Sequence, residues 1–209
     1  MRYDMHIHTK YSLCSINEPQ DIIKTAIKRK LDGILVVDHN SMKGSLQTKK
    51  LNKNPDMEVI VGSEIRTNFG DCTVFYLQED IKERDFFEVI DKVRQQDALI
   101  TIAHPYRLLP QLRFKGKMQK VDGIEALNAR TFPWENKKAE RIAEKLKIAK
   151  IGGSDAHFNW EIGNGVTIFE GDLRTAIKNR KTQVQGKTLP GFFGSAASFF
   201  LKRYRLLTS

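Results

Sequence analysis

Two histidines near the start of the chain are the first residues whose types and spacing could do chemistry. His6 and His8 flank Ile7 within residues 2–8, a segment whose pattern is typical of a short β-strand. Alternate side chains of a strand point to the same side, so we expect the two imidazoles to project together. Such a pair can hold one metal ion, although an HxH triplet also occurs often by chance.

The other histidines and several acidic or amide residues stand at the ends of apolar segments. A single histidine there is more often a hydrogen-bonded loop residue, and Asp38 or Asp155 could instead cap a helix. Glu64 is harder to explain in this way, because a carboxylate at a covered strand end needs a partner. The number of such residues at the ends of apolar segments nevertheless favours a cluster of metal ligands. The candidates are His6, His8, His39, Glu64, His104, Asn128, Asp155 and His157.

The elements that must position these residues are strands and helices in alternation, each recognised by the spacing of its apolar residues. Apolar runs predict strands over 2–8, 33–38, 57–64, 98–103, 123–127, 149–153 and 165–169. Helical spacing of apolar residues predicts helices over 18–30, 41–52, 82–96, 136–146 and 173–178. Asn17 is the expected N-cap of the first helix, and the turn at 68–71 predicts a hairpin onto a strand over 72–77. This alternation predicts an α/β fold with a mainly parallel sheet, doubly wound or closed into a barrel.

Parallel strands present their C-terminal ends on one face of such folds, where active sites are built. Every candidate ligand lies at the end of a predicted strand, so residues far apart in the sequence are expected to converge there. Glu125 lies within a predicted strand, and we expect it to point out of the barrel.

Composition and length indicate one globular domain in a reducing compartment. The chain has 209 residues, 40% of them hydrophobic and 29% charged. It has no apolar run of about 18 residues that would cross a membrane, and its start lacks the pattern of a signal peptide. Cys14 and Cys72 are expected to be reduced thiols, which predicts a cytoplasmic protein.

The net charge of +10 is concentrated toward the C-terminus, where residues 170–209 hold eight Lys/Arg against two acidic residues. A basic face favours polyanions such as nucleic acid, but it is equally consistent with a solvated surface. We divide the chain into a barrel over 1–183 and a basic, aromatic segment over 184–209. Residues 196–207 could pack on the barrel, which we favour, or bind nucleic acid, or lie on an anionic membrane.

Five motifs in this order and at these intervals resemble the polymerase and histidinol phosphatase (PHP) superfamily. They read HIHTKYS, VVDHN, GSEI, AHP and GSDAH, and the resemblance runs from Met1 to about residue 180. It implies a distorted (β/α)7, TIM-like barrel of seven parallel strands with a three-metal cluster at the C-terminal ends of the strands. Members of the superfamily hydrolyse phosphate esters, from small phosphomonoesters to nucleotides and nucleic-acid ends.

The resemblance also implies a division of the ligands among two or three divalent ions (zinc, manganese or iron). His6, His8, Glu64 and Asp155 would hold the first ion. Glu64 would bridge to a second ion held by His104 and Asn128, and His39 and His157 would hold a third. Two bridged ions can generate hydroxide near neutral pH for attack on phosphorus. Asp38 is expected to orient ligands or leaving-group water, so the catalytic residues would be Asp38, Glu64 and Arg107.

The sequence departs from the family pattern at two places. Many members have Asp where this chain has Leu13, so the third site lacks its usual carboxylate. Cys14 could replace it as a thiolate, or could simply be a buried cysteine, which is the more common case. Asn128 offers only a neutral oxygen where other members have a stronger ligand.

Positive charge near the ligands predicts where a substrate phosphate would bind. Arg107 and Arg130 are the preferred residues because guanidinium contacts phosphate through two hydrogen bonds, and Lys10 and Arg66 are further candidates. The sequence therefore predicts a metal-dependent phosphoesterase whose substrates are nucleotides or nucleic-acid ends. The alternatives are a phosphatase for small phosphorylated molecules, or a barrel that binds RNA without catalysis. No oligomeric state is predicted.

Overall fold

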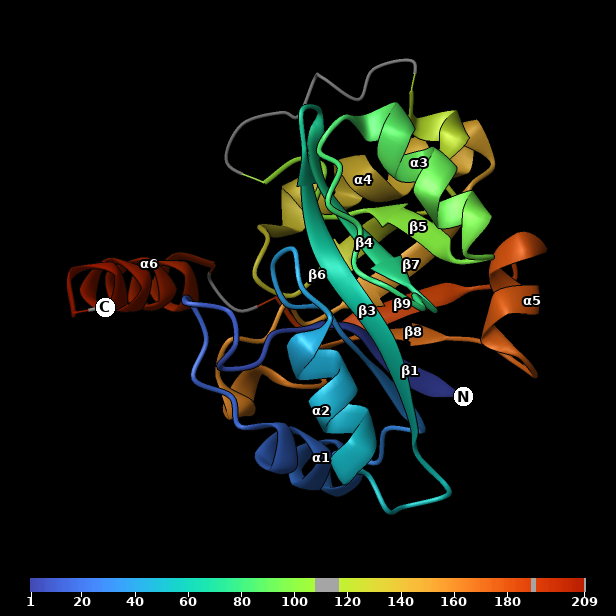
Figure 1. Cartoon of the computed structure of the whole chain (residues 1–209). Coiled ribbons are helices and arrows are strands. Elements are labelled where there is room, and N and C mark those ends of the chain that lie inside the picture. Colours follow the sequence, from blue (N-terminus) through green and yellow to red (C-terminus); the bar gives the residue numbers. More distant parts are fainter. Residues whose placement is uncertain (108–116, 189–190, 209) are drawn as a thin grey trace.

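The computed structural model describes residues 1–107, 117–188 and 191–208. Their strands are β1 (Arg2–Ile7), β2 (Gly33–Val36), β3 (Glu58–Thr67), β4 (Gly70–Phe75), β5 (Leu99–Ile102), β6 (Gly123–Asn128), β7 (Ala149–Gly153), β8 (Gly165–Ile168) and β9 (Gln183–Gly186). The α-helices are α1 (Pro19–Lys28), α2 (Lys43–Leu51), α3 (Phe86–Gln95), α4 (Pro133–Leu146), α5 (Leu173–Lys178) and α6 (Gly191–Thr208). Figure 1 shows the helices around a central sheet.

The strands form one sheet in the order β7-β6-β5-β4-β3-β2-β1-β8-β9. β1, β2 and β3 pair in parallel, as do β5, β6 and β7, whereas β4, β8 and β9 pair antiparallel to their neighbours. The sheet curves until an isolated parallel bridge joins Ile7, the last residue of β1, to Ala156, which follows β7. The predicted distorted α/β barrel is therefore confirmed. The expectation of seven parallel strands is wrong, because antiparallel strands complete the sheet.

An apolar core fills the barrel beneath the strand ends that carry the polar residues. Tyr3, Leu35, Ile60 and Phe75, which come from β1, β2, β3 and β4, belong to one buried cluster. Two further clusters bury the inner faces of α1, α3 and α4 against the sheet. Packing on both faces of the sheet explains why its strands read as continuous apolar runs.

The first helix begins one residue later than predicted. Glu18 occupies the N-cap position of α1 and its side chain makes no capping hydrogen bond. Asn17, the predicted cap, instead donates from Nδ2 to the carbonyl oxygens of His8 and Ala156, at 3.0 and 3.3 Å. The amide thus ties the end of β1 to the segment after β7, which is where the barrel closes.

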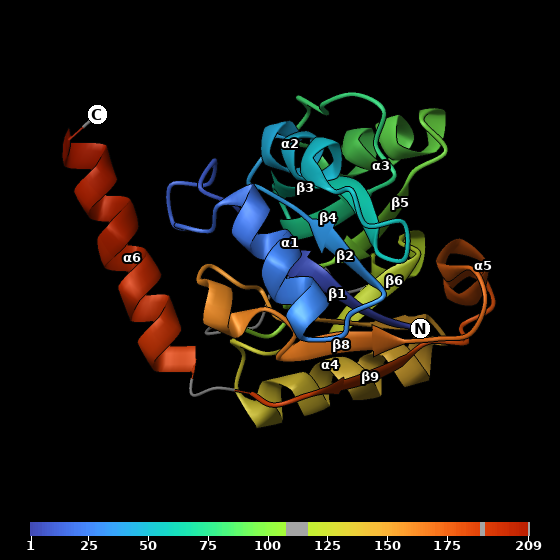
Figure 2. The same ribbon diagram turned by 90° about the horizontal axis from the view of Figure 1, so that it is seen from below.

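The last helix, α6, contacts the barrel along one side only. Figure 2 shows it lying at the edge of the molecule, away from the helices that cover the sheet. Arg205 donates to the carbonyl of Ser15 at 2.8 Å, whereas Phe200, Tyr204 and Leu207 are 68%, 66% and 79% exposed. β9 extends to residue 186 and so runs past residue 183, where the sequence suggested the barrel would end. Within the described residues no helix is both long and apolar enough to cross a membrane.

Candidate metal centre

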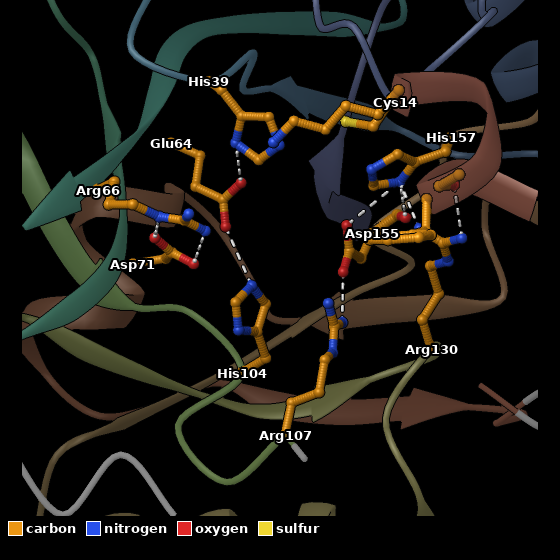
Figure 3. Close-up of a pocket in the computed structure, with 13 residues that line it drawn as sticks. Cys14, His39, Glu64, Arg66, Asp71, His104, Arg107, Arg130, Asp155 and His157 are labelled. Carbon is orange, nitrogen blue, oxygen red and sulfur yellow. Dashed lines mark hydrogen bonds and ion pairs between the residues drawn. The ribbon is translucent and has the colours of Figure 1, made fainter. Parts of the chain in front are cut away.

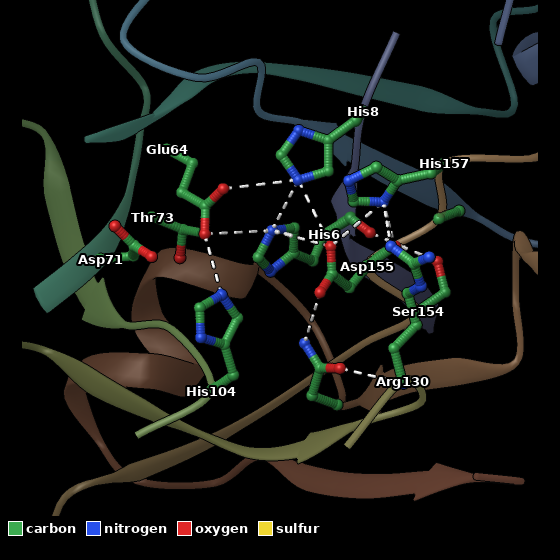
Figure 4. A network of polar contacts seen from close by, with 12 residues as sticks. His6, His8, Glu64, Asp71, Thr73, His104, Arg130, Ser154, Asp155 and His157 are labelled. Atoms are coloured by element: carbon green, nitrogen blue, oxygen red, sulfur yellow. Dashed lines mark hydrogen bonds and ion pairs between the residues drawn. The ribbon is translucent and has the colours of Figure 1, made fainter. Parts of the chain in front are cut away.

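The strand ends bring together three groups of possible metal ligands. Within each group one donor atom per residue lies within 4.8 Å of the others. The groups are His6, His8 and Glu64; His8, His39 and His157; and Glu64, Asp71 and His104. Figure 4 shows His6, His8, Glu64, His104 and His157 pointing toward a common centre.

The first group is deeply buried: His6, His8 and Glu64 are at most 1% exposed. His6 Nε2 and His8 Nε2 are 3.2 Å apart, and His8 Nε2 lies 3.4 Å from Glu64 Oε2. Asp155 Oδ1 joins them at 3.3 Å from His8 Nε2 and 3.7 Å from His6 Nε2. The structure thus gathers the four residues that the resemblance assigns to the first ion.

Glu64 is the residue that connects the groups. Its Oε1 lies 3.0 Å from His104 Nε2, and its Oε2 lies 2.8 Å from His39 Nδ1. Because each carboxylate oxygen faces a different histidine, Glu64 has the geometry of a bridging ligand.

Local backbone geometry allows this close approach. His104 and Asp155 have φ angles of 28° and 55°, in the left-handed region that residues other than glycine rarely adopt. Such strained residues cluster at functional sites. Next to Asp155, the backbone of Gly153 passes so close to β1 that an added Cβ would lie 2.5 Å from the Cβ of His6. The glycine of the GSDAH motif is therefore needed for β7 to bring Asp155 beside β1.

Glu125, which the sequence suggested would point out of the barrel, points into it. It is 3% exposed, and its Oε1 lies 3.0 Å from His6 Nδ1. Its Oε2 accepts hydrogen bonds from the backbone N–H of His104 at 2.6 Å and from Asn128 Nδ2 at 3.0 Å. Glu125 therefore fixes the orientation of the His6 ring, as a carboxylate behind a metal-binding histidine usually does.

Asp38 supports the other histidine of β1 through the loop that follows the strand. Its Oδ1 accepts from the backbone N–H of Thr9 at 2.8 Å and from Ser12 Oγ at 2.6 Å. Ser12 Oγ lies 3.4 Å from His8 Nδ1. Asp38 thus holds the loop after β1 and, through Ser12, lies behind the ring of His8.

Burial and neighbouring charges shift the pKa values of the acidic groups and histidines in the site. Burial would raise the pKa of Glu64, but the charges of His39 and His6 hold it well below its usual value. Burial likewise opposes ionisation of Asp155, whose pKa Arg107 and His6 nevertheless keep well below normal. Burial lowers the pKa of His39, yet the Glu64 carboxylate and Cys14 raise it to about 11. Burial and the charge of His8 together lower the pKa of His157 well below its usual value.

The donor atoms fit divalent transition metals. Imidazole nitrogens and carboxylate oxygens are ligands that zinc, manganese and iron accept. His104 Nδ1 is buried and has no hydrogen-bond partner among the described residues, which is unusual for a buried polar atom. Cys14 is buried beside His39 and hydrogen-bonds to it, whereas Leu13 is 42% exposed. The chain therefore offers ligands for divalent ions, and Cys14, not Leu13, contacts the side chain of His39.

A cavity of about 370 Å³ opens above the cluster (Figure 3). Arg107 and Arg130, predicted to bind phosphate, both line it. Arg107 pairs with Asp155, and Arg130 Nη1 lies 2.7 Å from His157 Nδ1. Helix α6 contributes Ser198, Phe199 and Lys202 to the cavity, a contribution that the sequence did not reveal.

Arg66 and Lys10 differ from these two arginines. Arg66 lines the cavity with a side chain that is 69% exposed, and it pairs with Asp71. Lys10 is not among the described residues that line the cavity, and its ammonium group pairs with Glu18 at 2.9 Å. The loop after β1 turns Lys10 away although it is close to His8 in the sequence.

Asn128 lies in the site, but its oxygen is directed to arginine. Its Oδ1 accepts from Arg107 Nη2 at 2.6 Å and from the backbone N–H of Arg130 at 2.9 Å. Asp71 lies beside Glu64 and His104 instead, as the third member of their group. Asp71 was not among the predicted ligands, because only the register of the β3–β4 hairpin puts it beside Glu64.

The chain belongs to the PHP domain family. A family model described as PHP domain matches residues 4–153, and one described as PHP-associated matches residues 133–182. Two uncharacterized proteins of Methanocaldococcus jannaschii are similar in sequence. One is 37% identical over 143 residues (62% of this chain and 82% of the relative), and the other is 35% identical over 179 residues (81% and 70%).

Solved structures share the fold at low sequence identity. A two-domain protein from Bacteroides vulgatus, described as containing a predicted PHP-like metal-dependent phosphoesterase, superposes with a TM-score of 0.74 and 19% identity. The match covers 90% of this chain but only 65% of that longer protein. PsfC from Pseudomonas syringae superposes with a TM-score of 0.67 and 17% identity, and the match covers 98% of both chains. These likenesses establish the architecture.

Proposed function

We propose that this protein is a metal-dependent phosphoesterase that acts on nucleotides or nucleic-acid ends. The observation that carries the proposal is the arrangement around Glu64. Three groups of ligands share residues there, beneath a cavity lined by Arg66, Arg107, Arg130 and Lys202. A divalent-metal cluster under a cationic wall is suited to hold a phosphate ester and stabilise its charge.

Seven of the eight residues predicted from the sequence are proposed as metal ligands: His6, His8, His39, Glu64, His104, Asp155 and His157. The oxygen of the eighth, Asn128, accepts hydrogen bonds from Arg107 and from the backbone N–H of Arg130. Divalent zinc, manganese or iron held by the proposed ligands would supply positive charge to phosphate oxygens and lower the pKa of a water molecule. Two or three such ions are proposed. The buried free thiols of Cys14 and Cys72 support a location in the cytoplasm.

Residues of the chain itself would bind and orient the phosphate. In this proposal, Arg107 and Arg130 donate hydrogen bonds to its oxygens, while Asp38 and Glu125 keep His8 and His6 in place. Arg66 and Lys202 lie at the open side of the cavity, where further phosphates of a longer substrate would leave it. Phe199 on α6 lines the same side and offers an aromatic face to a base.

The size of the cavity favours a second candidate, a phosphatase for small phosphorylated molecules. A volume of about 370 Å³ is at the lower end of the range for small-molecule sites. Binding of RNA without catalysis is less well supported, because such a barrel does not require its ligand residues to converge on one carboxylate.

Hydrolysis assays on purified protein with Mn²⁺ test the proposal. The substrates are a chromogenic phosphomonoester, mononucleotides, dinucleotides and short RNA and DNA. We expect chelator-sensitive release of phosphate or nucleotides, with higher kcat/KM for the nucleotide substrates. Greater efficiency on small sugar or amino-alcohol phosphates would favour the second candidate. No hydrolysis of any substrate by metal-loaded protein would contradict both.

A further inference from the structure

The ligand group made by Glu64, Asp71 and His104 differs from the one that the family resemblance implies. The resemblance puts Asn128 beside His104 at the second ion. The only atom by which an amide binds a cation is its oxygen, and in Asn128 that oxygen already accepts hydrogen bonds from Arg107 and from the backbone of Arg130. Its Nδ2 donates to Glu125 and Asp155. Asn128 therefore connects Arg107 to the carboxylates of Glu125 and Asp155.

The β3–β4 hairpin explains why Asp71 stands where a ligand is needed. In its antiparallel register Glu64 lies opposite Thr73, and Arg66 lies opposite Asp71. Residues two apart on a strand share a face, so Asp71 is the diagonal neighbour of Glu64 on the face that lines the cavity. Two paired strands fix this position more firmly than a loop would.

We propose that Asp71 is the carboxylate ligand of the second metal ion, in the place that the resemblance gives to Asn128. This assignment rests on the proposed metal centre. Because Glu64 would share its single negative charge between two ions, the carboxylate of Asp71 supplies charge at the second ion that the neutral amide of Asn128 lacks. His104, whose Nδ1 is buried without a partner among the described residues, belongs to the same group.

Arg66 holds Asp71 until the ion binds. Its Nε and Nη2 donate to Asp71 Oδ1 and Oδ2 at 2.9 and 3.2 Å, and they occupy the carboxylate that the ion requires. The side chain of Arg66 is 69% exposed, so water screens the pair and little free energy is lost when it opens. Once released, the guanidinium remains at the cavity and is free to contact a phosphate. Arg66 thereby links metal binding to substrate binding.

Metal titrations of three variants test the assignment. Metal-stripped wild type, Asp71→Asn and Arg66→Gln are titrated with Mn²⁺ or Zn²⁺, and the number of ions and their affinities are measured by calorimetry and elemental analysis. We expect Asp71→Asn to lose tight binding of one ion, with affinity falling by at least about tenfold. Arg66→Gln should keep the wild-type number of ions and bind the second equally or more tightly.

The opposite behaviour of the two variants separates a ligand from a structural ion pair. If Asp71 served only to pair with Arg66, both variants would lose the same property. Wild-type metal content in Asp71→Asn, or equal loss in Arg66→Gln, overturns the assignment. Asp71→Glu keeps the carboxylate and should recover part of the lost affinity, which shows that the loss is not a folding defect. Metal binding in these variants is independent of hydrolysis, so the assignment can hold where the proposed activity fails. A wild-type chain that binds no divalent ion overturns both.

Discussion

Glu64 separates two halves of the site that differ in how firmly the protein holds them. The inner half consists of His6, His8 and Asp155, which are at most 1% exposed. Each contacts a partner side chain: Glu125 for His6, Ser12 for His8 and Arg107 for Asp155. The outer half consists of His39, Asp71 and His104, which line the open cavity.

The outer half has fewer supports. The His39 side chain is 35% exposed, and Asp71 is held by an arginine that is largely in solvent. Ligands that are oriented before an ion arrives lose less freedom when they bind it. The site thus combines a preorganised inner half with a less constrained outer half.

Replacing Glu64 should have the largest effect, because it removes the residue common to both halves. Glu64→Gln keeps the shape of the side chain but bridges cations poorly. We expect turnover to fall roughly 10²–10⁴-fold, at about 1.4 kcal/mol of barrier per tenfold. The measurement is kcat of folded protein reconstituted with excess Mn²⁺. Glu58→Gln, at the other end of β3, is the matched control.

His157→Ala provides the internal comparison for this prediction, because His157 lies outside the Glu64 bridge. It should cost less activity than Glu64→Gln. Near-normal turnover in Glu64→Gln would rule out a mechanism that depends on a bridged pair of ions. Equal inactivation of both variants would mean that the ion near His39, Cys14 and His157 is also essential.

The positions of the ligands in these two halves were predictable from the sequence to different extents. His6, His8, His104 and Asp155 lie at strand ends, and the rule that parallel strands end on one face was sufficient to bring them together. Asp71 belongs to an antiparallel strand, to which that rule does not apply. Locating it requires the register of the hairpin, which the turn at residues 68–71 leaves undetermined.

Glu125 and β9 were missed for other physical reasons. The pairing of β6 with β7 is irregular between Glu125 and Leu127, so simple alternation along β6 assigns the wrong face to Glu125. β9 has the sequence Gln183-Val184-Gln185-Gly186, in which one apolar residue gives too little periodicity to indicate a strand. Pairing with β8 forms this strand, and a local pattern does not contain that information.

The division into two halves can be tested more sharply by removing the negative charge of Glu125, which lies behind His6 in the inner half. Glu125→Gln should weaken metal binding there by about 10–100-fold, because the imidazole of His6 loses its charged partner. The outer ion should be less affected, since the hydrogen bond from Glu125 to His104 is made to the backbone N–H and not to the ring. Competition with a chromogenic chelator measures the two affinities, and Glu140→Gln on the exposed face of α4 is the control. Equal weakening of both ions would contradict the division into halves.

The pH dependence of metal binding should follow from the histidine charges. Burial lowers the pKa of His6, but Glu125, Asp155 and Glu64 raise it well above normal, and the pKa of His39 is about 11. Both rings are therefore protonated on both nitrogens in the metal-free chain at neutral pH. An ion that binds one of these nitrogens must displace its proton. Affinity should rise with pH, by about tenfold per unit for each proton released. Calorimetry in two buffers of different ionisation enthalpy between pH 6 and pH 8 counts these protons. Binding without proton release would contradict this account.

The smallest effect is expected at the rim of the outer half, where α6 meets the cavity. Lys202 lines the cavity and its neighbour Arg203 is exposed on the helix, so the two cations differ mainly in where they point. If a nucleic-acid substrate leaves the site past α6, Lys202→Ala should raise KM for short oligonucleotides a few-fold and reduce the salt dependence of binding by about one phosphate contact. Arg203→Ala is the matched control and should leave both unchanged.

Hydrolysis of a small chromogenic phosphoester should survive in Lys202→Ala and, more stringently, after removal of residues 196–209. Equal effects of Lys202→Ala and Arg203→Ala would mean that general surface charge attracts the substrate. Loss of folding on truncation would show that α6 serves the barrel, and the argument for a long polyanionic substrate would lose its main support.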